Sequence, residues 1–244
     1  GSAIVLSATL TSEQRRLFAT AFRDACGPRN AEAGIAPALR RDRRARDATM
    51  TELSSRAFPL LTQAHGGGVM ELPVAHFDTG RPRVGVRRLG SRDVAVSEAV
   101  AAARRGGAVA VICNAVDEAI ATHAAILTEL GDPKAALLFH ARFAMVDRMQ
   151  IEQHVLHIFG KNADSSLRAG KIVVGTQVIE QSLDLDFDVM ITDLAPFDLV
   201  VQRAGRLWRH MQQRPAMARP VPAPCLAVIS PDPASVQSPR WLEP

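Results

Sequence analysis

The stretch "IVVGTQVIEQSLDLDFDVMI", residues 172–191, decides the fold. Two short apolar runs, "IVV" and "VMI", flank a segment that holds four carboxylates, two glutamines and one threonine. Short continuous apolar runs are typical of strands that are buried on both faces of a parallel sheet. The polar residues directly follow the first run, so we expect them at the sheet edge where its strand ends. Open α/β sheets bind their ligands at that edge.

Similar apolar runs continue on both sides of this stretch. From residue 84 onward they alternate with helical patterns near residues 93–105, 116–130, 144–159 and 197–211. Such alternation predicts an α/β domain with a doubly wound, mostly parallel sheet, which we place at residues 81–230.

The remainder of the chain has weaker patterns. Residues 1–27 read as a short strand followed by a helix, with a capping box formed by Thr11 and Gln14. Residues 28–68 lose this periodicity and include a basic segment at 40–46, so we predict a linker or insertion at residues 28–80. The Pro-rich residues 231–244 are predicted to be a tail or linker. Because the chain opens directly into a strand-like run, we expect it to be a fragment of a longer protein.

Composition narrows the class of protein only coarsely. The chain has 244 residues, of which 47% are hydrophobic and 22% charged, and this predicts a globular protein with a sizeable core. The formal net charge of +4 is compatible with a polyanionic partner without requiring one. Three widely separated cysteines form neither a disulfide framework nor a metal-ligand pair, so we expect a reducing, cytoplasmic environment. No apolar run approaches the ~20 residues that cross a bilayer, and we expect no membrane partner.

Three motifs carry a resemblance to a known family. The segments "SAT" at 7–9, "GTQVIEQSLD" at 175–184 and "QRAGRLWR" at 202–209 resemble motifs III, V and VI of superfamily 2 helicases in order and spacing. With "FHARF" and "LAPFDLVVQRAGRLWRH" added, the chain resembles more narrowly the helicase part of the CRISPR-associated helicase-nuclease of type I interference systems. The resemblance implies a RecA-like second lobe at 81–230 and a remnant of the first lobe at 1–27.

The third motif contains the predicted catalytic residues. If residues 198–209 form one helix, Gln202, Arg206 and Arg209 share one face of it. The resemblance implies that the two arginines are arginine fingers, which stabilise the charge that gathers on the γ-phosphate of ATP. It places Gln202 near the phosphate or the attacking water. The alternative is a basic surface helix, and Gly205 argues against it because glycine is a poor helix former.

The polar segment after "IVV" is expected to couple two ligands. By resemblance, Gly175 and Thr176 offer a backbone N–H and a hydroxyl to a nucleic-acid phosphate. Asp184 is expected to reach the ribose hydroxyls of ATP, and Arg203 is expected to be a second ATP contact. The resemblance places Glu180 and Gln181 between the two sites.

Two further acids of this segment, Asp186 and Asp188, are interpreted as turn and cap residues. Asn114 follows the run "AVAVI" and is either a contact to a nucleic-acid phosphate or a helix cap. Ser7 and Thr9 resemble residues that link the ATP state to lobe closure, although either could also be a cap. His154 and His157 lie three residues apart without a third ligand in view, so no metal site is predicted.

Two motifs are absent from the sequence. It contains no GxxxxGK[ST] phosphate-binding loop and no His-Asp dipeptide that would indicate the family's nuclease. ATP and magnesium are therefore expected to be held mainly by a first lobe outside this chain, and the chain alone is expected to be inactive. The implied partners are single-stranded DNA, an RNA-guided surveillance complex, and the first lobe and nuclease domain of the same protein. The alternatives are another superfamily 2 helicase, acting on RNA or in repair, and a non-catalytic nucleic-acid- or partner-binding module.

Overall fold

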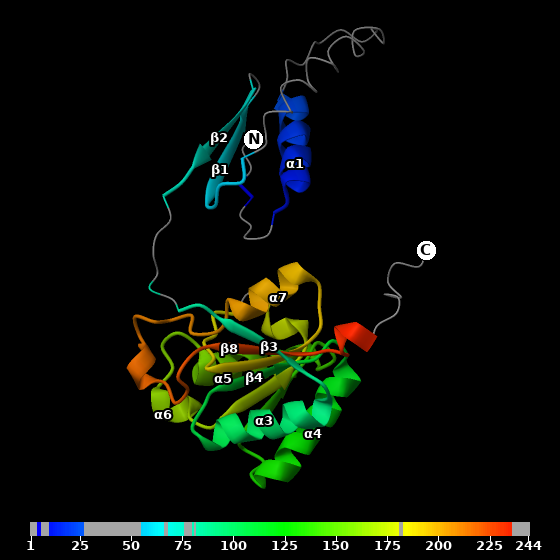
Figure 1. The fold of residues 1–244 in the computed structure, drawn as a ribbon, viewed down its shortest axis with the longest axis vertical. Coiled ribbons are helices and arrows are strands. Elements are labelled where there is room, and N and C mark those ends of the chain that lie inside the picture. Colours follow the sequence, from blue (N-terminus) through cyan, green and yellow to red (C-terminus); the bar gives the residue numbers. More distant parts are fainter. Residues whose placement is uncertain are drawn as a thin grey trace. The chain divides into compact units, whose positions relative to one another are not determined.

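A computed structural model of the 244-residue chain describes residues 4–5, 10–26, 55–65, 68–75, 80, 82–180 and 183–235. The predicted coupling residues Ser7, Thr9 and Gln181 lie outside the described residues, as does the basic segment at 40–46. The chain divides into two compact units, residues 1–78 and 79–244 (Figure 1).

The first unit pairs one helix with a β-hairpin. Helix α1 (Ser12–Cys26) packs against β1 (Leu60–His65), which is antiparallel to β2 (Gly68–Pro73). The predicted capping box is present, since the N–H of Gln14 donates to Oγ1 of Thr11 and the N–H of Thr11 donates to Oε1 of Gln14. The hairpin falls inside the range predicted to be a linker or insertion, where its short, half-exposed strands gave no clear pattern.

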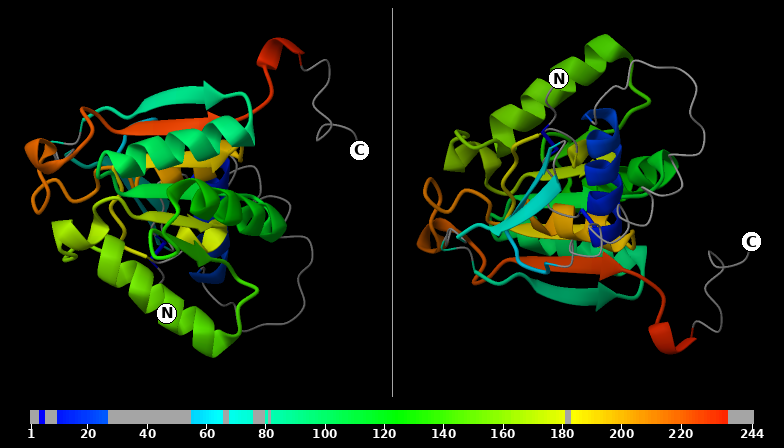
Figure 2. Two further views of the ribbon diagram at one scale, coloured as in Figure 1. Left: turned by 90° about the horizontal axis from the view of Figure 1, so that it is seen from below. Right: turned by 90° about the horizontal axis from the view of Figure 1, so that it is seen from above.

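The second unit is built on one six-stranded parallel sheet. Its strands, in the spatial order β3-β8-β7-β4-β6-β5, are all parallel to their neighbours. Their bounds are β3 Gly85–Leu89, β4 Val109–Ile112, β5 Ala136–Phe139, β6 Ile172–Gly175, β7 Val189–Asp193 and β8 Cys225–Ile229. Figure 2 shows β3 and β8 side by side at one edge. The predicted doubly wound α/β fold is confirmed, and the carboxyl ends of all six strands point to one edge of the sheet.

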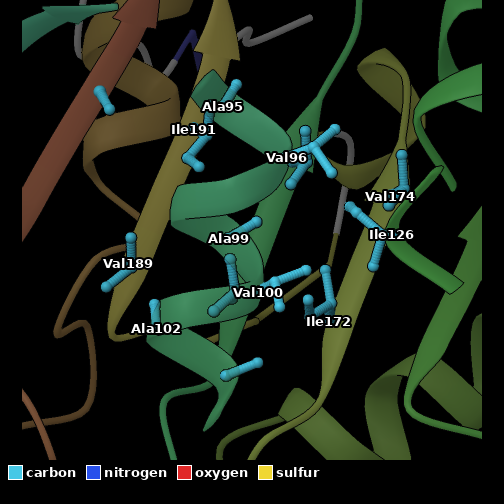
Figure 3. Close-up of a cluster of buried hydrophobic side chains, with 14 of the residues drawn as sticks. Ala95, Val96, Ala99, Val100, Ala102, Ile126, Ile172, Val174, Val189 and Ile191 are labelled. Carbon is cyan, nitrogen blue, oxygen red and sulfur yellow. The ribbon is translucent and has the colours of Figure 1, made fainter. Parts of the chain in front are cut away.

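Helices cover both faces of this sheet. The helices of the unit are α3 (Arg92–Arg104), α4 (Val116–Leu130), α5 (Met145–Phe159), α6 (Ser165–Arg168) and α7 (Phe197–Ala204). Figure 3 shows how α3 and α4 pack on alternate strand residues such as Val174 and Ile191. The other strand residues, such as Val173 and Met190, pack against α5 and against partly buried side chains of α7. Every residue of β4, β6 and β7 is buried, which explains their continuous apolar runs.

The helix that carries the predicted arginine fingers is shorter than expected. It ends at Ala204, and the N–H of Phe187 then donates to O of Arg206, whereas the N–H of Trp208 donates to O of Phe187, both at 3.0 Å. The chain after Gly205 therefore pairs with the segment before β7. The prediction of one helical face for Gln202, Arg206 and Arg209 was wrong. Glycine weakens the helix at that point, and the buried side chains of the residues that follow hold the chain in a turn.

Candidate functional site

The site lies at the carboxyl ends of the central strands. Ile112, the last residue of β4, is in register with Gly175 at the end of β6 and with Thr192 near the end of β7. The three segments that follow these strands are therefore neighbours in space. They contain Asn114, the polar segment from Thr176 onward and α7, which the sequence analysis singled out.

Close packing at the end of β6 explains Gly175. A Cβ atom at this position would lie 2.2 Å from the carbonyl oxygen of Phe139, on β5, and 2.8 Å from Cδ1 of Ile179. Only glycine lets β6 approach β5 this closely. The next residue, Thr176, is 3% exposed, and its N–H donates to O of Phe139 at 3.3 Å. Since that N–H is engaged within the lobe, the predicted nucleic-acid contact of Thr176 rests on its hydroxyl group.

Asn114 connects the ends of β4 and β7. Its backbone N–H donates to Oδ2 of Asp193 at 2.8 Å, and its side-chain amide donates to O of Leu194 at 2.7 Å. The N-cap residue of α4 is Ala115, so the alternative role of Asn114 as a helix cap is not observed. Asn114 is exposed at the rim, and its contact with a nucleic-acid phosphate stays a prediction.

Asp193 is bound from its other side by an arginine that the sequence analysis missed. Nη2 of Arg92 lies 2.7 Å from Oδ1 of Asp193 and 3.2 Å from Oε2 of Glu118. Nη1 of the same guanidinium lies 3.3 Å from Sγ of Cys113, whose pKa burial raises to about 11, so this thiol is neutral near pH 7. Arg92 belongs to no motif and lies 101 residues from Asp193, and no local pattern could have paired them.

Arg203 is the central structural residue of the site. Its side chain is completely buried, and Nε donates to Oε1 of Glu180 at 2.7 Å. Its Nη1 donates to Oγ1 of Thr192 and, at 3.1 Å, to O of Asp193. The guanidinium thus ties α7 to the segment after β6 and to the end of β7. The side chain of Arg203 has no exposed surface in this lobe and positions its neighbours, and its contact with ATP stays a prediction.

The predicted arginine fingers lie beside this buried pair. Nη2 of the half-buried Arg206 donates to the backbone oxygen of Glu180 at 2.8 Å. Burial lowers the pKa of Arg206, and the like charge of Arg209 lowers it further, although the guanidinium remains charged at any physiological pH. Glu180 therefore contacts Arg203 through its side chain and Arg206 through its main chain. Gln202 is exposed on α7.

Arg209 and Asp184 form an ion pair at the surface of the site. Nε of Arg209 lies 2.5 Å from Oδ1 of Asp184, and Nε2 of His210 lies 3.1 Å from the same oxygen. Burial opposes ionisation of Asp184, but the hydrogen bond from Arg209 and the charges around it hold the pKa of Asp184 below its ordinary value. Burial lowers the pKa of His210 despite the nearby Asp184, so the imidazole is neutral near pH 7. Three predicted residues, Arg206, Arg209 and Asp184, are thus brought together.

A buried ionic network lies directly behind these residues. Asp186 and Asp188 are completely buried, which corrects their interpretation as turn and cap residues. Arg219 donates to Asp186 and Asp188 at 3.1 Å, Arg214 donates to Asp188 at 2.5 Å, and Arg168 donates to Asp186 at 3.3 Å. The partners are 18 to 33 residues apart in sequence, which is why the sequence analysis could not pair them.

The described part of the chain has neither a metal-ligand cluster nor a membrane-spanning helix. Within the described ranges, no cluster of three or more His, Cys, Asp or Glu side chains could hold a metal ion, and the paired histidines of α5 find no third ligand there. Among the helices that the structure describes, none is long and apolar enough to span a membrane.

The chain is similar in sequence to known proteins. Residues 105–212 match the family model described as "CRISPR-associated nuclease/helicase Cas3, C-terminal". The chain is 48% identical over 119 residues to the "CRISPR-associated endonuclease/helicase Cas3" of Escherichia coli strain K12, which covers 48% of this chain and 13% of that protein. It is 32% identical over 214 residues to the Cas3 nuclease/helicase of Streptococcus thermophilus, covering 87% of this chain and 21% of the relative.

Solved structures show the same likeness. The "Crystal structure of T. fusca Cas3-ATP" superposes with a TM-score of 0.63 and 31% identity, over 75% of this chain and 22% of that one. A chain of the "CRISPR RNA-guided surveillance complex, pre-nicking" gives a TM-score of 0.60 and 29% identity, over 75% of this chain and 23% of that one. The chain thus spans less than a quarter of these relatives. It belongs to the Cas3 nuclease/helicase family and carries the RecA-like C-terminal lobe of its helicase.

Proposed function

We propose that this lobe is the second half of an ATP-dependent single-stranded DNA translocase, or helicase, of CRISPR antiviral defence. The observation that carries the proposal is the buried contact of Arg203 with Glu180, Thr192 and Asp193. It fixes the end of α7 against the carboxyl edge of the sheet. Arg206 and Arg209 follow immediately, at the edge where an α/β sheet binds its ligands.

The residues present fit one side of a nucleotide site. Arg206 and Arg209 offer two cations near the ribose-binding candidate Asp184, and the chain lacks the loop that would cradle phosphates. ATP with magnesium would thus be held mainly by the first lobe, and when bound it would undergo the phosphoryl transfer that powers movement. Crystal structures named for Cas3 with ATP, AMPPNP and ADP are among the structural relatives. In this chain the two arginines would stabilise negative charge as it develops on the γ-phosphate.

Other residues at the same carboxyl edge of the sheet would contact DNA. Thr176, Gly175 and the exposed Asn114 are the candidates for holding backbone phosphates, which allows binding without regard to base sequence. Glu180 follows Thr176 by four residues and contacts both Arg203 and Arg206. A displacement of the segment after β6 by DNA would therefore reach the arginines directly. This short connection is the proposed physical basis of DNA-stimulated ATP hydrolysis.

The partners follow from the relatives. One structural relative is titled as part of an RNA-guided surveillance complex before nicking. We infer that a protein carrying this lobe acts in the cytoplasm on the single strand that such a complex displaces, and delivers it to a nuclease domain of the same protein.

The proposal is tested in a protein that carries this lobe together with its phosphate-binding lobe. ATP hydrolysis should be stimulated by single-stranded DNA and much less by RNA of the same sequence. Equal stimulation by RNA would indicate a different class of superfamily 2 helicase. Absence of ATP hydrolysis with either nucleic acid would instead favour a non-catalytic docking module.

A further inference from the structure

The turn that follows α7, residues 205–209, is fastened to the buried ionic network. The backbone N–H of Arg209 donates to Oδ1 of Asp186 at 2.7 Å, and Asp186 has no exposed surface. A buried carboxylate therefore holds the main chain of a predicted arginine finger. The side chain of Arg209 is left to face Asp184 at the surface.

Arg219 holds the same turn from the other side. Its Nη2 lies 3.1 Å from both carboxylate oxygens of Asp186, and its guanidinium carbon lies 4.9 Å from the centre of the Trp208 ring. Cation–π contacts of this kind are favourable when the cation is desolvated. Arg219 thus contacts the turn at Trp208 and also orients the carboxylate that binds Arg209.

The backbone of the turn needs such support. Trp208 has a φ of 47°, in the left-handed region that non-glycine residues rarely adopt. Its N–H is bound by the carbonyl oxygen of Phe187 at 3.0 Å, immediately before the N–H of Arg209 reaches Asp186. An unfavourable backbone conformation persists only where surrounding contacts determine it, and such conformations cluster at functional sites.

We propose that Asp186 and Arg219 are positioning residues for the arginine fingers. They set the conformation of residues 205–209 and thereby place the guanidinium groups of Arg206 and Arg209 for the transition state. Both act from behind the site, since their side chains are buried and present no surface that could touch a nucleotide. The inference rests on the proposed function of the two arginines and adds the elements that hold them.

The test compares two matched variants in the protein with both helicase lobes. Asp186→Asn removes the negative charge and puts an NH₂ donor in place of one oxygen, either Oδ1, which accepts from Arg209 and Arg219, or Oδ2, which accepts from Arg168 and Arg219. In either orientation the amide cannot hold Arg219 through two oxygens as the carboxylate does. Asp188→Asn makes the same chemical change in the same network, where Asp188 accepts from Arg214, Arg219 and the N–H of Ala108 but not from Arg209. Any effect of weakening the network alone should appear equally in both variants.

The measured quantity is the affinity for ADP with aluminium fluoride, a mimic of the transition state, against the affinity for ADP alone. Asp186→Asn should weaken binding of the mimic about tenfold or more, because a displacement of about 1 Å can cost on the order of 10²-fold in rate. The affinity of Asp186→Asn for ADP alone should be unchanged. Its melting temperature should equal that of Asp188→Asn. Adding Asp186→Asn to Arg209→Ala should give no further loss.

The outcomes distinguish the positioning role of Asp186 and Arg219 from the proposed function of the two arginine fingers. If Arg209→Ala weakens binding of the mimic and Asp186→Asn does not, or if Asp188→Asn weakens it equally, the positioning role is wrong and the proposed function survives. If Arg209→Ala has no effect, both are wrong. Should Asp186→Asn fail to fold, Arg219→Lys replaces it, since lysine keeps the charge but cannot span both carboxylates. Unchanged affinity for the mimic in Arg219→Lys would then overturn the inference.

Discussion

The guanidinium of Arg203 lies inside the lobe and donates a hydrogen bond to the buried carboxylate of Glu180 over 2.7 Å. This pair joins α7 to the segment after β6. The two residues belong to different sequence motifs and lie 23 residues apart. Every proposed role of Arg206 and Arg209 depends on where this pair holds the end of α7.

Removing one member of the pair should destabilise the lobe strongly. Glu180→Ala would leave the Arg203 cation buried without a countercharge, which typically costs about 3–5 kcal/mol of unfolding free energy. The control is Asp117→Ala, which removes an exposed ion pair with Arg142 and should change stability by less than about 1 kcal/mol. Urea denaturation followed by circular dichroism measures both. Similar small losses in the two variants would show that the buried pair does not hold the fold.

Gly175→Ala should destabilise the sheet at its carboxyl edge. The added Cβ would lie 2.2 Å from a backbone oxygen of β5, and a backbone atom in a parallel sheet cannot easily yield. Overpacking of this kind costs about 1–3 kcal/mol. Gly90→Ala is the control, because its Cβ would meet nothing closer than 3.8 Å. Thermal unfolding should show a clear loss for Gly175→Ala only, and equal melting temperatures would contradict the packing described at β6.

The 244-residue chain on its own should hydrolyse no ATP above background. Its arginines have no phosphate-binding loop to face, since the sequence contains no GxxxxGK[ST]. Phosphate release with and without single-stranded DNA measures this directly. Robust DNA-stimulated turnover would reveal a nucleotide site that neither the sequence nor the described structure contains.

Binding of single-stranded DNA by this chain alone should be weak and steeply dependent on salt. One lobe offers only a few phosphate contacts, and phosphate contacts release counterions on binding. We expect dissociation constants of about 10⁻⁶ M or weaker, similar for different base sequences. Fluorescence anisotropy at two salt concentrations provides the measurement. Tight binding that ignores salt or selects a base sequence would contradict a backbone-phosphate interface.

The sequence predicted what depends on local pattern. The apolar runs predicted the strands of the parallel sheet, and the motif residues Glu180 and Arg206 are in contact at its carboxyl edge, as are Asp184 and Arg209. Arg203 was also in a motif, but its burial depends on β7 lying beside β4, which no single motif encodes.

Ion pairs between residues far apart in the chain could not be predicted from local sequence patterns. Asp186 and Asp188 looked like turn residues because their arginine partners lie 18 to 33 residues away in the sequence, without periodicity. The end of α7 was misjudged for a related reason. Helical spacing favoured a longer helix, whereas the pairing of Phe187 with the chain around Leu207 is a tertiary contact.

The central claim is that Arg206 and Arg209 act on the transition state and that DNA binding depends on other residues. In the protein with both lobes, ATP turnover and DNA affinity are measured for Arg206→Ala, Arg209→Ala and Thr176→Ala. The arginine variants should lose ATPase activity by about 10³-fold or more while DNA affinity is largely kept. Thr176→Ala should weaken DNA binding and DNA stimulation while basal hydrolysis stays nearly intact. Arginine variants that hydrolyse ATP normally but lose DNA would contradict the account, because the turn after α7 would then be a docking surface.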